Sequence, residues 1–229
     1  MITMAPPKGE SWVWPALAVV VAAVLYARLP DKYVASGSIG VLGVARFVVP
    51  ALEILLLAPL FLAAPRSELL GRLWGRRVVL ALIGLISLAN AGSMILLVHY
   101  IITGHKLGGH ELVLASIDIW WTNVIVFSLW FWQLDGGGPT NRTVEQPTYE
   151  RDFLFPQLEN PAVAPPGWLP MYLDYFYTSF TNAAAFSPTD VLPLSRGAKM
   201  LMLIESGASL LTLLMVASRA VNILGSRRT

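Results

Sequence analysis

A polar segment in the second half of the chain carries the side chains best suited to contact an ion. Residues 181–190 combine hydroxyl groups, an amide and a carboxylate. Oxygen atoms of these kinds can replace part of the water shell of a cation, and a ring of carboxylates attracts cations to a pore. The candidate ion contacts are Thr181, Asn182, Ser187, Thr189 and Asp190. In the alternative interpretation, Asp190 only caps this loop or holds it to the preceding helix.

Two opposite charges lie inside an apolar stretch nearer the N-terminus. Arg46 and Glu53 are seven residues apart, which places both on one face of a helix. Charges at membrane depth are costly and usually pair with each other or with a neighbouring helix. The pair could form an ion-conducting or voltage-responsive path, but we favour a structural pair that locks helix packing. A voltage sensor needs several regularly spaced arginines on one helix, and no early apolar stretch has them.

Two more carboxylates fall within apolar stretches. Glu205 lies about two turns into the last stretch, beside Ser206 and Gly207, and Asp118 lies two turns into the preceding one. Neither side chain can face lipid cheaply. We expect Asp118 to pack against another helix. For Glu205 two interpretations stay open: it lines an interior vestibule, or it forms a hydrogen bond that holds a neighbouring helix.

The sequence gives metal, cofactor and enzyme chemistry little support. His105, His110 and Glu111 supply enough ligands for zinc, but their spacing matches no known ligand frame. His99 has no matching histidine on another apolar stretch, so a haem is not expected, and the chain has no cysteine. No nucleophile elbow, phosphate-binding glycine loop or zinc-protease motif is present. We therefore expect no metal, no cofactor and no enzymatic activity.

The amino-acid composition is typical of an integral membrane protein. Of the 229 residues, 55% are apolar and 13% are charged, whereas soluble domains carry about 25% charged residues. The net charge of +2 is too small to indicate nucleic-acid binding. Five apolar stretches are long enough to cross a bilayer as helices. They are residues 12–29, 39–64, 78–102, 111–134 and 198–224.

These stretches predict an all-α integral membrane protein with five transmembrane helices plus one re-entrant, pore-type helix and loop. Residues 1–110 form an N-terminal three-helix transmembrane region, and residues 111–229 form a pore-like module. Its outer helix is expected at residues 111–134 and its inner helix at 198–224. Residues 135–168 are polar and rich in proline, so we expect an extramembrane loop there. Residues 169–193 hold the re-entrant helix, at 171–182, and a non-helical loop from 183 onwards, because this segment is too short to span.

Four segments follow one another at the end of the chain: a short aromatic-rich helix, a polar loop, a basic turn and a long apolar helix. The sequence Asp190-Val191-Leu192-Pro193 ends the loop, Thr181 lies near the end of the short helix, and Lys199 opens the last helix. In these features residues 174–224 resemble the pore region of the potassium-channel superfamily, whose filter loop ends in D-x-x-P. Gly207 resembles the glycine hinge of channel inner helices.

A closer resemblance covers roughly the second half of the chain. Its signature segments are FTNAAAFSPTD at residues 180–190, WFWQLDGGGP at 130–139 and DFLFPQ at 152–157. They are similar to an uncharacterised family of bacterial membrane proteins that carry a pore-like loop. The resemblance implies a multi-pass protein of the bacterial inner membrane and a pore-loop fold, without assigning an activity.

The loop departs from potassium channels where their selectivity arises. A potassium filter aims successive backbone carbonyls at the pore axis, which requires glycine at left-handed dihedrals. No glycine occurs between Gly167 and Gly197, and proline holds its φ near −65°. The filter-like loop comprises Thr181, Asn182, Ala183, Ala184, Ala185, Phe186, Ser187, Pro188, Thr189 and Asp190. We therefore do not expect potassium selectivity by the carbonyl mechanism.

Together these features predict a homotetramer in the lipid bilayer that passes monovalent cations passively. The small alanines of the loop would let four copies approach closely or leave a wider constriction, and Phe186 could plug the axis. The rival prediction is a non-conducting scaffold or partner-binding protein that retains the pore-loop fold.

Overall fold

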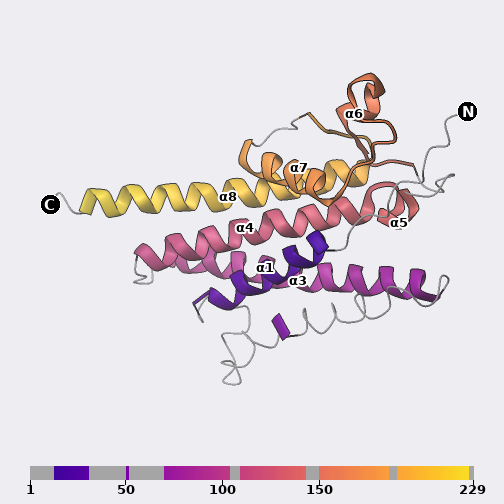
Figure 1. Cartoon of the computed structure of the whole chain (residues 1–229). Helices are drawn as coiled ribbons and strands as arrows, with labels where there is room; N and C mark the ends of the chain where they lie inside the picture. The colour runs from indigo at the N-terminus through magenta and orange to yellow at the C-terminus, as the bar shows by residue number, and fades with distance from the viewer. Residues whose placement is uncertain are drawn as a thin grey trace, which may run out of the picture. The chain divides into compact units, whose positions relative to one another are not determined.

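The computed structural model describes residues 13–30, 50–51, 70–103, 109–142, 150–185 and 190–226, and most of these lie in helices (Figure 1). The longer helices are α1 (Val13–Arg28), α3 (Leu70–Ile102), α4 (Gly109–Leu134), α7 (Tyr172–Ala185) and α8 (Arg196–Ser226). The short elements are η2 (Asp135–Gly137), α5 (Pro139–Arg142), β1 (Phe153–Leu154), α6 (Pro156–Glu159), η3 (Pro161–Val163) and β2 (Leu192–Pro193). The prediction of a mainly helical chain is confirmed.

Within the described residues, three helices are long and apolar enough to cross a membrane. They are Arg77–Ile102, His110–Gly137 and Arg196–Ser218, and they match the third, fourth and fifth predicted stretches. The first stretch forms α1, an apolar helix of 16 residues, which is shorter than the roughly 20 residues a span needs. The second stretch, apart from residues 50 and 51, lies outside the described residues. The total of five crossings stays a prediction.

The distribution of side chains on α1 is typical of a helix in lipid. Several of its larger apolar residues are exposed, with Val24 54% exposed, although Val19 and Tyr26 are buried. Three of its alanines are buried, with Ala22 1% exposed. Small residues let helix backbones approach closely in membranes, where large apolar side chains can face the acyl chains. Ala18, Ala22 and Ala23 are all buried, which agrees with close packing on this side of α1.

The described chain divides into two compact units. Unit 1 contains Met1–Pro15 and Phe127–Ser206, and unit 2 contains Ala16–Val126 and Gly207–Thr229. The end of α4, the whole of α7 and the beginning of α8 therefore belong to unit 1, together with the segment that joins α4 to α7. The candidate site described below lies wholly within unit 1. The predicted division of the chain at residue 110 stays a prediction.

The segment predicted as a loop, residues 135–168, contains short ordered elements. Its strand β1 pairs antiparallel with β2, with Phe153 opposite Pro193 and Leu154 opposite Leu192. The backbone N–H of Leu194 also donates to the carbonyl of Asp152 at 2.8 Å. This pairing joins the long connection to the chain that leads into α8.

Helix α7 is longer than the sequence predicts. It ends at Ala185, so the expectation of a non-helical run from residue 183 is wrong for Ala183, Ala184 and Ala185. Alanine has the highest intrinsic helix propensity, and Ala183 is fully buried in unit 1. With 14 residues the helix is still about 21 Å long, too short to span the roughly 30 Å of hydrocarbon.

Candidate functional site

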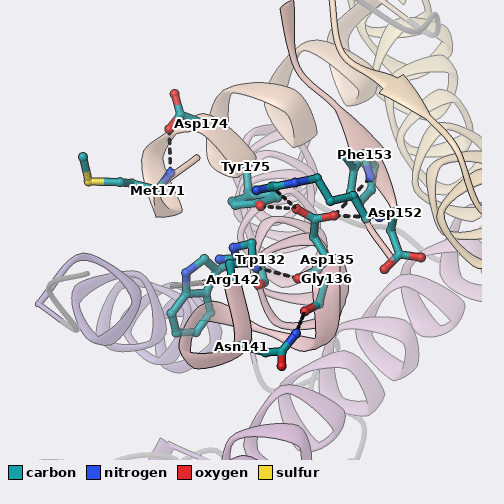
Figure 2. Close-up of polar contacts among 11 residues, drawn as sticks. Trp132, Asp135, Gly136, Asn141, Arg142, Asp152, Phe153, Met171, Asp174 and Tyr175 are labelled. Carbon is teal, nitrogen blue, oxygen red and sulfur yellow. Dashed lines mark hydrogen bonds and ion pairs between the residues drawn. The ribbon is translucent and has the colours of Figure 1, made fainter. Parts of the chain in front are cut away.

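The carboxylate of Asp135 is buried at the end of α4 and has partners on two other segments of unit 1 (Figure 2). Its Oδ1 accepts hydrogen bonds from the backbone N–H groups of Asp152, at 2.7 Å, and Phe153, at 3.1 Å. Its Oδ2 accepts a hydrogen bond from the hydroxyl of Tyr175 on α7. Nη1 of Arg151 lies 3.9 Å from the same oxygen. One carboxylate thus connects the end of α4, the start of β1 and α7.

Arg142 completes this group of residues, which we call the Asp135 cluster (Asp135, Arg142, Arg151 and Tyr175). Its Nη1 donates to the carbonyls of Trp132, at 2.7 Å, and Asp135, at 2.8 Å. These carbonyls lie at the end of α4, where backbone oxygens lack helical partners and a cation is favourable. The guanidinium carbon also lies 4.9 Å from the centre of the Tyr175 ring, so Arg142 joins α4 to α7 as well.

A glycine turn brings Arg142 back to α4. Gly136, Gly137 and Gly138 have φ values of 57°, 77° and 99°, in the left-handed region that favours glycine. A Cβ atom on Gly138 would lie 3.1 Å from the carbonyl oxygen of Gln133, so a side chain there would also be crowded. The sequence GGGP therefore does more than end the helix, because the reversal places an arginine over the helix end.

Aromatic rings surround the Asp135 cluster and pack the connection against the membrane helix. Phe153 lies 5.0 Å from Phe131 of α4 and 6.3 Å from Tyr175, measured between ring centres. Phe155 lies 5.3 Å from Tyr175 and 5.8 Å from Trp168. Because aromatic pairs at these separations stabilise beyond their buried area, the connection is a packed part of unit 1.

Burial strengthens the preference of Tyr175 for its neutral form. Removal from water raises its pKa well above the ordinary value, and the hydrogen bond to Asp135 raises the pKa further, while the charges of Arg142 and Arg151 oppose the shift. The phenol therefore stays neutral at physiological pH and keeps the proton that it donates to the carboxylate. Burial likewise raises the pKa of Tyr172, whose hydroxyl lies 2.8 Å from Ser128 Oγ on α4.

A second buried carboxylate, Glu205 of α8, holds the other end of α7. The hydroxyl of Ser179 donates to Glu205 Oε1, and Nδ2 of Asn182 donates to Oε2 at 2.7 Å. Asn182 Nδ2 also lies 3.0 Å from the carbonyl of Met202, and Ser206 Oγ lies 3.1 Å from Asn182 Oδ1. We call this group the Glu205 contact (Ser179, Asn182, Glu205 and Ser206). It joins the last turns of α7 to α8, which lie side by side in Figure 1.

The beginning of α7 has its own cap. Asp174 Oδ2 accepts a hydrogen bond from the backbone N–H of Met171 at 2.7 Å, as an acidic residue in the first turn commonly does (Figure 2). Partial burial raises the pKa of Asp174 above its ordinary value, although this hydrogen bond opposes the shift. Helix α7 is thus held near both ends, at Tyr172 and Tyr175 in its first turn and at Asn182 in its last turn.

The residues predicted to contact an ion are partly placed by the structure. Thr181 is half-buried and its hydroxyl donates to the carbonyls of Tyr177, at 2.7 Å, and Thr178, at 3.0 Å. Asn182 and Ala183 are buried, whereas Ala184, Ala185 and Asp190 are exposed. The other predicted site residues lie outside the described part of the chain. They are Arg46, Glu53, Phe186, Ser187, Pro188 and Thr189.

The surroundings of Glu205 favour one of its two interpretations. Its side chain is completely buried and bonded to α7, which is the helix-holding role. The exposed side of α8 carries Leu203, Ile204 and Gly207 instead, and a Cβ atom on Gly207 would meet nothing within 4 Å. A vestibule lined by α8 would therefore be apolar near this position.

Sequence reasoning did not single out the Asp135 cluster. Two of the segments used for the family resemblance, residues 130–139 and 152–157, meet at the Asp135 carboxylate. The available signal was an aspartate at the end of an apolar, aromatic helix, followed by three glycines and an arginine.

Comparison of the chain with known proteins finds no match. The chain matches no protein-family model, no curated protein and no solved structure. In the described part of the chain no three His, Asp or Glu side chains are placed to hold a metal ion, and His105 lies outside that part. Function must therefore be argued from unit 1 itself.

Replacing Asp135 by alanine should destabilise the fold strongly. Two backbone N–H groups and the Tyr175 hydroxyl would lose their acceptor in a buried site, which we expect to cost about 3 kcal/mol or more. Asp174→Ala is the matched control, because it removes one hydrogen bond at a partly exposed helix start and should cost about 1 kcal/mol. Unfolding in mixed micelles measures both free energies. Equal losses would contradict the central role of Asp135.

The contribution of Tyr175 should depend on pH. Its pKa is higher in the folded state than in the unfolded state, so the folded protein keeps this proton when the unfolded chain loses it. The stabilisation is complete below about pH 10, the ordinary tyrosine pKa, and is lost as the pH rises further. The stability difference between wild type and Tyr175→Phe should therefore shrink above this pH. The exposed-position variant Tyr177→Phe controls for general alkaline effects, and a pH-independent Tyr175→Phe difference would refute the assignment.

Proposed function

We propose that the chain forms a pore-loop membrane protein, a homotetramer that passes monovalent cations passively without carbonyl-ladder potassium selectivity. The proposal includes five crossings of the bacterial inner membrane and a re-entrant helix formed by α7. It also keeps the resemblance to the uncharacterised pore-loop family as a hypothesis.

The observation that carries the proposal is the way α7 is held. This helix is too short to span, follows one spanning-length helix in the sequence and precedes another, and makes buried polar contacts with both. Ser128 of α4 contacts its first turn, and Glu205 of α8 contacts its last turns. A short helix supported by an outer and an inner helix is the arrangement that presents a loop at a pore axis.

The chemistry of the lipid phase supports the same proposal. Backbone groups beyond the end of a helix find no hydrogen-bond partners in hydrocarbon, so an irregular segment at membrane depth must face protein or water. The exposed apolar side chains of α8, such as Leu203 and Leu214, suit lipid or further copies of the chain. A closed ring of copies around a central path meets both requirements.

Asp190 is the side chain we assign to ion attraction. It is exposed after the end of α7 and just before β2, so four copies would place four carboxylates near one axis. Such a ring concentrates cations electrostatically without selecting among them by backbone coordination. Potassium and sodium should therefore both pass.

The direct test is cation flux through the purified protein in liposomes and planar bilayers. Wild type should conduct monovalent cations, and Asp190→Asn should lower the conductance severalfold at low salt. The difference should narrow at high salt, because salt screens exposed charges. Glu159→Gln, an exposed carboxylate variant in α6, is the matched control and should behave as wild type. A wild type that is silent for every ion and voltage would refute the proposal.

The second candidate is a non-conducting scaffold or partner-binding protein with the same fold. It is favoured by the sequence of residues 180–190, which lacks the glycines of an ion filter. Oligomer mass separates the two candidates, since a monomer or dimer supports the scaffold and a tetramer with cation flux supports the pore.

A further inference from the structure

We propose that Glu205 is a positioning residue, which sets the place of the α7 C-terminus and thereby the ion preference of the loop that follows. This inference rests on the proposed pore function. In this proposal Glu205 affects the ion path through the position of α7 and does not itself contact the ion.

The Glu205 contact fixes α7 in two directions. Ser179 and Asn182 are three residues apart on α7, and both donate to the one carboxylate. Asn182 in turn bonds two groups on α8, the Met202 carbonyl and the Glu205 carboxylate, which are also three residues apart. Contacts spaced by one turn on both helices resist sliding of α7 along α8 and rotation of α7 about its own axis.

Ser206 adds a cap to the end of α7 from the neighbouring helix. The last four carbonyls of a helix lack partners within it, and in α7 the Asn182 carbonyl is the first of these. Ser206 Oγ donates to this oxygen at 3.3 Å as well as to Asn182 Oδ1. The point where α7 stops is therefore held by α8 side chains.

Burial makes the contact sensitive to the chemistry of the acceptor. Ser179, Asn182 and Glu205 are all at most 3% exposed, so water cannot replace a lost partner. Glutamine at 205 has nearly the same shape but offers only one acceptor oxygen, so its NH₂ group faces either Asn182 Nδ2 or Ser179. Asn182 Nδ2 cannot accept a hydrogen bond, and Ser179 can accept one only by turning its hydroxyl. We therefore expect the contact to weaken and the end of α7 at Ala185, three residues after Asn182, to shift.

The contact also ends where unit 1 ends. Ser206 is the last residue of α8 in unit 1, and Gly207 is the first in unit 2. The part of α8 that belongs with α7 is therefore the part that carries Glu205 and Ser206. Coupling of α7 to α8 through Glu205 acts within one compact unit.

Two readouts on the full-length protein test this inference. Glu205→Gln should change the sodium-to-potassium permeability ratio, measured from bi-ionic reversal potentials, by about twofold or more. It should also speed amide hydrogen exchange of residues 179–185 by about tenfold. Asp118→Asn, which neutralises a buried carboxylate in unit 2, is the matched control and should change neither readout.

If Glu205→Gln fails to fold, Ser179→Ala and Ser206→Ala each remove one donor and should shift the same readouts in the same direction.

The outcomes separate this inference from the proposed function. A silent wild type refutes the pore, while faster exchange in Glu205→Gln still supports the positioning of α7 by Glu205. A conducting Glu205→Gln protein with wild-type permeability ratio and wild-type exchange overturns the inference and leaves the pore standing.

Discussion

A carboxylate removed from water needs donors for both of its oxygens, and Asp135 finds them on β1 and α7. This requirement organises unit 1. The glycine turn after α4 returns Arg142 to the helix end, the β1 backbone turns its N–H groups inward, and Tyr175 faces the carboxylate. Because Arg142, Phe153 and Tyr175 are themselves buried, none of them can leave without exposing a polar group to an apolar interior.

The need of buried carboxylates for hydrogen-bond donors also explains how α7 is placed. Helix α7 carries polar residues, and hydrogen bonds to α4 and α8 within unit 1 set its position. Asp135 holds the first turn of α7 through Tyr175, Glu205 holds its last turns, and the exposed side of α8 carries apolar residues such as Leu203 and Ile204. The polar groups that hold α7 are thus buried within unit 1.

Length and hydropathy were sufficient to predict the long helices. The stretch predicted at residues 111–134 forms α4 at Gly109–Leu134, because a long, mostly apolar run that ends at three glycines favours a helix of this length. The end of α7 was missed, since alanine propensity and burial outweighed the expected loop. The Asp135 cluster was not predicted because Asp135 and Tyr175 are forty residues apart, and hydropathy carries no information on pairing at that distance. The helix-holding role of Glu205 was one of two alternatives that the sequence left open.

The account depends on α7 ending at a shared axis, and a map of the reconstituted protein by electron cryomicroscopy tests this most directly. We predict four copies around one axis, with residues 183–190 nearest to it, Asp190 facing the path, and Glu205 buried against α7 within each copy. A monomer or dimer would contradict the account, and so would a tetramer whose α7 helices point away from the axis.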